Sequence, residues 1–191
     1  MTVEPTLAEQ SGLGVVLVEP RIPGNVGAIG RLCACTGSAL YLVGDLGFSF
    51  GDKYLKRSGM DYLAHVEPVH VEDFEALRAL NPDWGFSLLS TRARHCYTQI
   101  PFKRGHYLIF GSEATGLPEA VLTHYAQHAF RVPMLADRRS LNLATCASVV
   151  LYEGLRQLGG WPSHPTAGPA LGPVVEPVVG PVVGPNAGSP K

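Results

Sequence analysis

The sequence predicts one α/β domain with a mainly parallel sheet flanked by helices, and three observations support this prediction. Short, continuous apolar runs alternate with helical stretches, which is typical of strands that are buried on both faces. The chain has 191 residues, 46% of them hydrophobic, and is therefore long enough to bury a core. Loops rich in glycine and polar residues follow several of the runs, as at the ligand-binding edge of open α/β sheets.

Five apolar runs have the length and composition of buried strands, and the less apolar residues 65–70 are a further candidate strand. In chain order, the expected strands are residues 15–18, 39–43, 65–70, 85–89, 107–110 and 129–132. Turn-forming residues bound them: Glu19-Pro20 follows the first run and Gly44-Asp45 the second. Because helical stretches separate many of these runs, we expect crossover connections, which make neighbouring strands parallel.

Four stretches are expected to be helical. In chain order, they are residues 26–36, 53–58, 71–80 and 143–158. The third ends before Asn81-Pro82, since the residue before a proline avoids helical backbone. The fourth is the clearest, with Asn142 as a candidate N-cap and Gly159-Gly160 as its stop. Its first half is so uniformly apolar that we expect burial on more than one side, against the sheet and a second subunit.

The two ends of the chain differ from the middle. Residues 1–12 are predicted to be a flexible lead-in and residues 13–160 the folded domain. Residues 161–191 repeat Pro-Val-Val among Gly, Ala and Ser, which is typical of an extended, mobile tail. The sequence has no signal-peptide pattern and no apolar run of membrane-spanning length, so we expect a soluble, cytoplasmic protein.

Net charge and cysteine spacing exclude two further classes of protein. A formal net charge of −1 argues against a protein that coats nucleic acid indiscriminately, although basic patches can still bind RNA. The four cysteines have no zinc-ligand spacing, and we interpret them as small buried side chains in a reducing compartment.

Three polar segments, the first two of them rich in glycine, follow predicted strands. Residues 23–31 (Pro-Gly-Asn-Val-Gly-Ala-Ile-Gly-Arg) have neither the G-x-G-x-x-G spacing of dinucleotide sites nor the Gly-Lys-Ser/Thr of a P-loop. Residues 111–118 (Gly-Ser-Glu-Ala-Thr-Gly-Leu-Pro) contain glycines that let backbone approach a ligand closely. Residues 132–142 place Ser140 and Asn142 just before the last helix. Taken singly, each segment can also be explained structurally, as a turn or a helix cap.

Taken in order, the three segments resemble the three motifs of the SPOUT RNA methyltransferases. The flanks are similar to those of the small tRNA cytidine/uridine 2′-O-methyltransferases of this family, which modify the anticodon wobble nucleotide. The flanking residues that carry this likeness are Glu19-Pro20, Ile22-Pro23, Arg31-Leu32-Cys33-Ala34, Thr36-Gly37, Gly47-Phe48, Asp52-Lys53 and Asp61-Tyr62. The resemblance covers residues 15–159.

The resemblance implies transfer of a methyl group from S-adenosylmethionine to the ribose 2′-hydroxyl of the wobble nucleotide in tRNA. Leucine isoacceptors are the expected substrates. A C-terminal trefoil knot, a homodimer and the absence of a required metal are implied as well. By position, the implied cofactor contacts are Leu89, Gly111, Val132, Ser140 and Leu141, with Leu143 close by.

The implied catalytic residues are Arg31, Asn25, Glu113, Ser140 and Asn142. The family's arginine is expected to assist deprotonation of the hydroxyl, but a guanidinium stays protonated at neutral pH and is a poor base. Two interpretations of Arg31 therefore stay open: a base in a special environment, or an electrostatic stabiliser of the forming alkoxide. The other four side chains are expected to orient Arg31 and the ribose. The expected RNA contacts are Lys53, Arg57, Arg138 and Arg139.

Some positions depart from the pattern of the wobble enzymes. Ser112 stands where Pro is more usual, Ala114 where Thr is, and Arg138 where Ser is common. These differences leave the reaction class intact but bear on which nucleotide is methylated. Two alternatives follow: the same reaction at another tRNA or rRNA site, and a non-catalytic RNA-binding protein with this fold. The minimal length favours the wobble enzyme, and the joint presence of the catalytic set argues against a non-catalytic protein.

Overall fold

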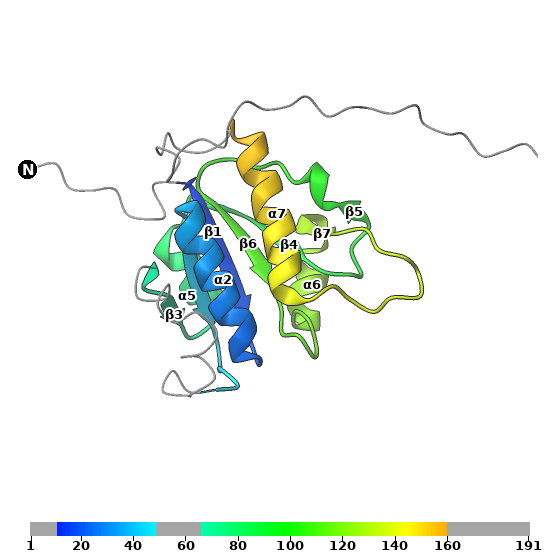
Figure 1. Cartoon of the computed structure of the whole chain (residues 1–191), viewed down its shortest axis with the longest axis horizontal. Coiled ribbons are helices and arrows are strands. Elements are labelled where there is room, and N and C mark those ends of the chain that lie inside the picture. Colours follow the sequence, from blue (N-terminus) through cyan, green and yellow to red (C-terminus); the bar gives the residue numbers. More distant parts are fainter. Residues whose placement is uncertain (1–10, 49–65, 160–191) are drawn as a thin grey trace, which may run out of the picture.

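The computed structural model describes residues 11–48 and 66–159, which form a parallel sheet with helices on both faces (Figure 1). In chain order, the strands are β1 (Leu13–Val18), β2 (Ala39–Val43), β3 (Val69–Val71), β4 (Gly85–Leu89), β5 (His95–Cys96), β6 (His106–Phe110) and β7 (Ala129–Arg131). Their order across the sheet is β3-β2-β1-β6-β4-β7-β5, and every neighbouring pair is parallel. The loops after β1, β6, β4 and β7 therefore lie side by side at one edge.

The helices cover the two faces of this sheet as two layers (Figure 1). They are α2 (Pro23–Thr36), α5 (Phe74–Leu80), α6 (Glu119–His124) and α7 (Leu143–Gln157), with 3-10 turns η1 (Tyr97–Gln99) and η2 (Ala126–His128). One core joins α2 and α7 to Val15 and Leu17, and a second joins α5 and α6 to Val16. Successive residues of a strand point to opposite faces, so β1 supplies both cores.

The predicted α/β class is confirmed, and five of the six predicted strands appear with ends shifted by at most two residues. The exception is the run at 65–70, because β3 begins only at Val69. Glu67 has a left-handed φ of 44° and Pro68 follows it, so the backbone turns before the strand starts. The two-residue β5 was not predicted, since so short a segment leaves no alternation pattern. Strand order does not test the trefoil knot, which stays a prediction.

Two predicted helices begin at different residues in the structure. α2 starts at Pro23 rather than at residue 26, since proline at the first helical position loses no hydrogen bond. α5 starts at Phe74 rather than at residue 71, because the side chain of Asp73 caps it by accepting from Ala76 N at 2.8 Å. The expected helix at 53–58 lies outside the described residues. The short α6 and both 3-10 turns were not predicted.

The last helix confirms its predicted cap and stop. Asn142 Oδ1 accepts from the backbone N–H groups of Ala144 (2.9 Å) and Thr145 (3.2 Å). Gly159 has a φ of +92°, a conformation that ends the helix at little cost for glycine. The side chains that α7 buries are Ala147, Val150, Leu151 and Leu155.

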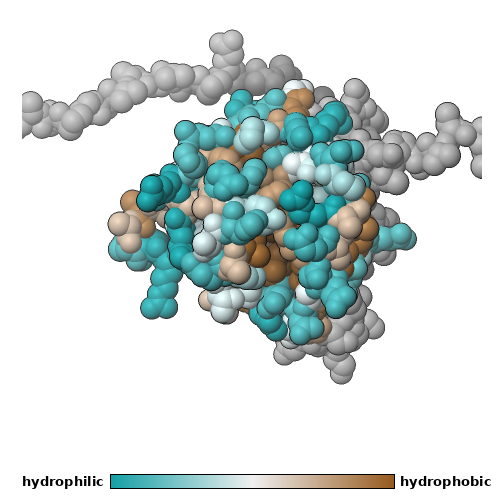
Figure 2. Space-filling view, turned by 180° about the vertical axis from the view of Figure 1, so that it is seen from behind, coloured by the Kyte–Doolittle hydropathy of each residue, from teal (hydrophilic) through white to brown (hydrophobic). Residues whose placement is uncertain are grey.

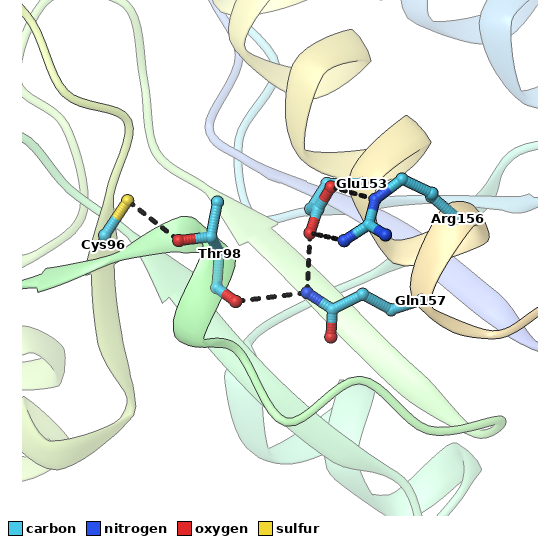
Figure 3. A network of polar contacts seen from close by, with 5 residues as sticks. All are labelled: Cys96, Thr98, Glu153, Arg156 and Gln157. Atoms are coloured by element: carbon cyan, nitrogen blue, oxygen red, sulfur yellow. Dashed lines mark hydrogen bonds and ion pairs between the residues drawn. The ribbon is translucent and has the colours of Figure 1, made fainter.

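Polar contacts hold the C-terminal end of α7 on η1 (Figure 3). Gln157 Nε2 donates to the carbonyl oxygen of Thr98 at 3.1 Å and to Glu153 Oε1 at 2.7 Å. Arg156 donates twice to the same carboxylate, at 2.9 and 2.8 Å. These donors lower the pKa of Glu153 to about 2, Arg156 contributing most. The helix is thus fixed at both ends.

The described part of the chain begins inside the fold. Ser11 and Gly12, which the sequence analysis assigns to the lead-in, are buried, and Ser11 Oγ lies 2.9 Å from Ser38 Oγ. Residues 1–10 and the predicted tail lie outside the described residues, so the proposed lead-in and tail stay predictions.

Figure 2 shows that the face opposite α2 and α7 is mostly hydrophilic, with scattered apolar side chains. Among the described helices, none is long and apolar enough to cross a membrane.

His106 is a buried histidine at the first residue of β6, the sheet edge opposite the glycine-rich loops. It is 3% exposed, and its Nε2 lies 2.9 Å from Ser87 Oγ. Its Nδ1 has no hydrogen-bond partner among the described residues. Burial lowers the pKa of His106 to about 4, and the charges of Lys103 and His128 add to the effect. The native state therefore holds this imidazole neutral.

We expect the free energy of unfolding to fall as the pH drops from about 7 to 4. In this window His106 becomes protonated in the unfolded chain but stays neutral in the native state, so protonation favours unfolding. The stability is therefore fully present above the unfolded pKa and is lost as the pH falls toward the folded pKa. The depressed pKa of His106 sets the loss at up to about 3 kcal/mol. Urea unfolding at pH 7 and pH 5 measures it, with His106→Gln as the matched variant. An equal pH dependence in both proteins would rule out this histidine as the cause.

Candidate active site

The three motif segments meet around a cavity of about 800 Å³ at the carboxyl edge of the sheet. Its walls come from the loops that follow β4, β6 and β7 and from the turn between β1 and α2. Open parallel sheets bind ligands at this edge. The volume is in the range of sites for small organic ligands.

The loop after β6 turns back on itself so tightly that it requires glycine. Ser112 and Gly116 exchange two backbone hydrogen bonds of 3.1 and 2.8 Å. A Cβ atom on Gly111 would lie 2.1 Å from the carbonyl carbon of Gly116, so no side chain fits there. Gly116 has a φ of +72°, in the left-handed region that favours glycine. This compact loop directs Glu113 toward α2.

Glu113 holds the two residues that lead into α2, a helix whose own N-cap residue makes no capping hydrogen bond. The Ile22 side chain makes no capping hydrogen bond, and the first turn of α2 contains no acidic residue. Glu113 Oε2 accepts from Arg21 N at 2.9 Å, and its Oε1 accepts from Ile22 N at 3.2 Å. Oε1 also accepts from Asn25 Nδ2 at 2.8 Å. A carboxylate at this position is further stabilised by the positive end of the helix dipole.

Asn25 extends this arrangement to the last helix. Its Oδ1 accepts from Asn142 Nδ2 at 2.9 Å, and the residue is 6% exposed. Because Asn25 Nδ2 donates to Glu113, only its oxygen is left to face Asn142. Asn142 in turn uses its own oxygen to cap α7. A single chain of hydrogen bonds therefore joins segments that are 88 and 117 residues apart.

The structure brings most of the predicted site residues together. The predicted cofactor contacts line the cavity: Leu89, Gly111, Val132, Ser140 and Leu141, together with Leu143. The predicted catalytic residues that line it are Asn25, Glu113, Ser140 and Asn142. The cavity thus combines apolar side chains and loop backbone with a cluster of polar groups.

Arg31 lies apart from this cluster. Among the described residues, the cavity wall includes Asn25 but not Arg31. Arg31 is exposed on α2, six residues and therefore about 9 Å farther along the helix axis, on a different side of the helix. A single chain does not bring Arg31 to the other four predicted catalytic residues.

The predicted RNA contacts occupy different positions. Arg139 lines the cavity. Arg138 is outside the wall, and its Nη2 lies 3.3 Å from Asp137 Oδ2. Lys53 and Arg57 lie outside the described residues.

Two further charged residues, which were not predicted as site residues from the sequence, also line the cavity. Arg92 follows β4, Glu119 is the first residue of α6, and their side chains form an ion pair. They are 27 residues apart on different loops, and no spacing pattern reports such a contact. Cys146 also lines the wall, and burial raises the pKa of its thiol to about 11. Within residues 11–48 and 66–159, no cluster of His, Cys, Asp or Glu is suited to hold a metal ion.

The cap and the link to Asn25 can be separated at Asn142. Asn142→Ala removes both, and we expect it to lower the free energy of unfolding by roughly 1 kcal/mol. Asn142→Ser should recover most of that loss, because a serine hydroxyl caps a helix but does not reach Asn25 as the amide does. Urea unfolding of the three proteins checks this. Equal stability of the alanine and serine variants would show that the cap contributes little.

Comparison with known proteins agrees with this geometry. Residues 12–152 match the SpoU rRNA Methylase family. The chain is 42% identical over 149 residues to the tRNA (cytidine(34)-2′-O)-methyltransferase of Escherichia coli K12, covering 77% of this chain and 94% of the relative. It is equally identical over 144 residues to the enzyme of the same name from Methylovorus glucosotrophus, covering 75% and 94%.

Solved structures show the same fold. One, on the 2-OH methylation of C/U34 on tRNA, aligns with a TM-score of 0.71 at 39% identity, covering 76% of this chain and 95% of the other. The SpoU methyltransferase AviRb from Streptomyces viridochromogenes, in complex with the cofactor AdoMet, aligns with a TM-score of 0.66 at 28% identity. That match covers 78% of this chain and 58% of AviRb. The chain belongs to the SpoU methylase family.

Proposed function

We propose that this protein transfers a methyl group from S-adenosylmethionine to the ribose 2′-hydroxyl of the wobble nucleotide, cytidine or modified uridine, in tRNA. The observation that carries the proposal is that Glu113, Asn25 and Asn142 join the three motif segments around one cavity. The relatives that are 42% identical over three quarters of this chain are named for methylation at this nucleotide. By the resemblance, we propose leucine isoacceptors as the substrates.

The chemistry of the cavity fits S-adenosylmethionine. Leu89, Val132 and Leu141 offer apolar surface to the adenine, and the loop from Gly111 to Pro118 offers backbone groups to the ribose and base. When bound, the cofactor supplies a methyl carbon on a sulfonium, which is already activated for displacement. The protein therefore has to align the acceptor hydroxyl with that carbon and support the charge that develops on its oxygen.

We assign the alignment to the polar cluster beside the cavity. Ser140 and Asn142 line it at the start of α7, and both carry hydrogen-bonding groups for a ribose. Both oxygens of Glu113 are occupied by donors, so this carboxylate fixes the position of α2 and Asn25 instead of abstracting a proton. The rigid network holds the acceptor in one orientation, which contributes to the rate by reducing the entropy lost at the transition state.

We propose a homodimer as the setting in which Arg31 acts. α2 and α7 pack against each other, and Tyr152 of α7 is a large side chain that is 46% exposed. A second subunit on this surface would cover both helices, which includes the exposed Arg31. Arg31 of one subunit would then serve the cavity of the other, as a stabiliser of the developing alkoxide.

The remaining proposals concern RNA, topology and location. Arg139 is positioned to contact a phosphate at the cavity, and Arg138, Lys53 and Arg57 are proposed to extend this basic surface. By the resemblance, we also propose a trefoil knot formed by the C-terminal part of the domain. From the composition of the two ends, we propose a lead-in before residue 11 and a tail after residue 160, and we propose a cytoplasmic location.

Purified protein, labelled S-adenosylmethionine and total tRNA should give 2′-O-methylation at the wobble position, and rRNA should stay unlabelled. Arg31→Ala should abolish transfer because the alkoxide loses its stabilising charge. Affinity for S-adenosylhomocysteine should stay unchanged, since Arg31 does not line the cavity. Arg94→Ala, at an exposed arginine outside the cavity wall, is the control. Wild-type activity in Arg31→Ala would contradict the catalytic role of Arg31. Label on rRNA alone would show that the acceptor is an rRNA nucleotide and not the tRNA wobble ribose.

Mixed dimers test the arrangement across subunits. Arg31→Ala and Asn142→Ala subunits are inactive as separate homodimers if both residues are needed. When the two are coexpressed, one cavity per dimer combines an intact Asn142 with an intact Arg31 from the neighbour. Activity should therefore return in the mixed dimers. Continued inactivity would show that Arg31 acts within its own subunit.

A further inference from the structure

An ion pair lies at the cavity two strands away from the catalytic cluster. Arg92 follows β4, which β6 separates from β1 and from the start of α2, a distance of about 10 Å across the sheet. Glu119 begins α6 at the end of the glycine-rich loop. Two hydrogen bonds join the side chains, from Arg92 Nη1 to Glu119 Oε2 and from Nη2 to Oε1, the second of 2.9 Å. The pair thus bridges two of the loops that form the cavity.

This pair is well suited to exchange partners. Each side chain is 66% exposed, so water already solvates both charges. Exposed ion pairs contribute little to stability, and opening one costs little. The planar guanidinium of Arg92 presents a fork that accommodates any carboxylate in two hydrogen bonds. Glu119 in turn accepts from any ammonium group.

We propose that Arg92 and Glu119 recognise the amino-acid end of S-adenosylmethionine, which carries a carboxylate and an ammonium group on one carbon. Arg92 takes the carboxylate, and Glu119 takes the ammonium. The exchange replaces one ion pair by two, and the amino-acid end, being a zwitterion, itself adds no net charge to the cavity. This inference rests on the proposed use of that cofactor.

The other charges around the cavity do not offer this combination. Among the lining residues that the structure describes, Glu113 is occupied by α2, and Glu19 accepts from Arg21 at 2.8 Å. Arg139 lines the cavity without an acidic partner within hydrogen-bonding distance among the described residues. An amino acid needs a cation and an anion side by side, and Arg92 and Glu119 are the lining residues that meet this condition in the described part of the chain.

Two ligands that differ only at this end test the proposal. S-adenosylhomocysteine carries the amino acid, whereas 5′-methylthioadenosine has a methyl group in its place. Calorimetric titration of both into the full-length protein gives the ratio of their affinities. Arg92→Gln and Glu119→Gln should each weaken S-adenosylhomocysteine roughly tenfold, as expected for loss of one charge-assisted contact. Both variants should bind 5′-methylthioadenosine within about twofold of wild type, because the adenosine contacts persist.

Arg94→Gln is the matched control, because it removes an exposed arginine from the same loop without touching the cavity. It should leave both affinities unchanged, and all variants should unfold at the wild-type temperature. Equal weakening of the two ligands in Arg92→Gln, or no weakening of either, would overturn the proposal. A wild-type protein that binds neither ligand would instead overturn the proposed function. Because binding is measured without RNA, the test of Arg92 and Glu119 does not depend on which RNA nucleotide is methylated.

Discussion

The carboxylate of Glu113 holds the start of α2 against the loop that follows β6. It accepts the backbone N–H groups of Arg21 and Ile22, the two residues that precede α2, and the first turn of α2 contains no acidic residue of its own. Its third bond, from Asn25, fixes an amide whose oxygen then receives Asn142. One anion therefore links the start of α2 to the start of α7, in addition to the core that packs the two helices together. Without it, the backbone N–H groups of Arg21 and Ile22 would lose their acceptor beside the cavity.

Stability and site formation are located at opposite edges of the same sheet. The amino ends of β4 and β6 carry the buried contact between Ser87 and His106, which belongs to the packing of the strands. The carboxyl ends carry the loops, where Gly111 allows two backbone segments to approach more closely than a side chain permits. The apolar side chains, the loop backbone groups and the charged residues that line the cavity are thus brought together at the carboxyl edge. This separation is the usual arrangement of open α/β sheets.

The sequence predicts the strands and helices of this fold better than it predicts which of them lie side by side. Buried strands and the last helix follow from apolar runs and from the cap at Asn142, and the structure confirms them. Their order across the sheet does not follow, because each buried run is compatible with any central position. The ordered glycine-rich motifs predict the cavity-lining residues through family resemblance. The contact between Arg92 and Glu119 joins loops 27 residues apart, and the distance of Arg31 from the cavity appears only once α2 has a defined rotation.

Mapping of 2′-O-methylation in tRNA from a strain that lacks this gene tests the central claim most directly. The hydrogen-bonded cluster and the relatives that are named for methylation at nucleotide 34 of tRNA together support the proposed acceptor, the wobble ribose. We predict that 2′-O-methylation at this nucleotide disappears from specific isoacceptors and returns when the intact gene is supplied. All other 2′-O-methyl positions should be retained. Unchanged wobble methylation in that strain, with loss at a different tRNA or rRNA nucleotide, would contradict the assignment.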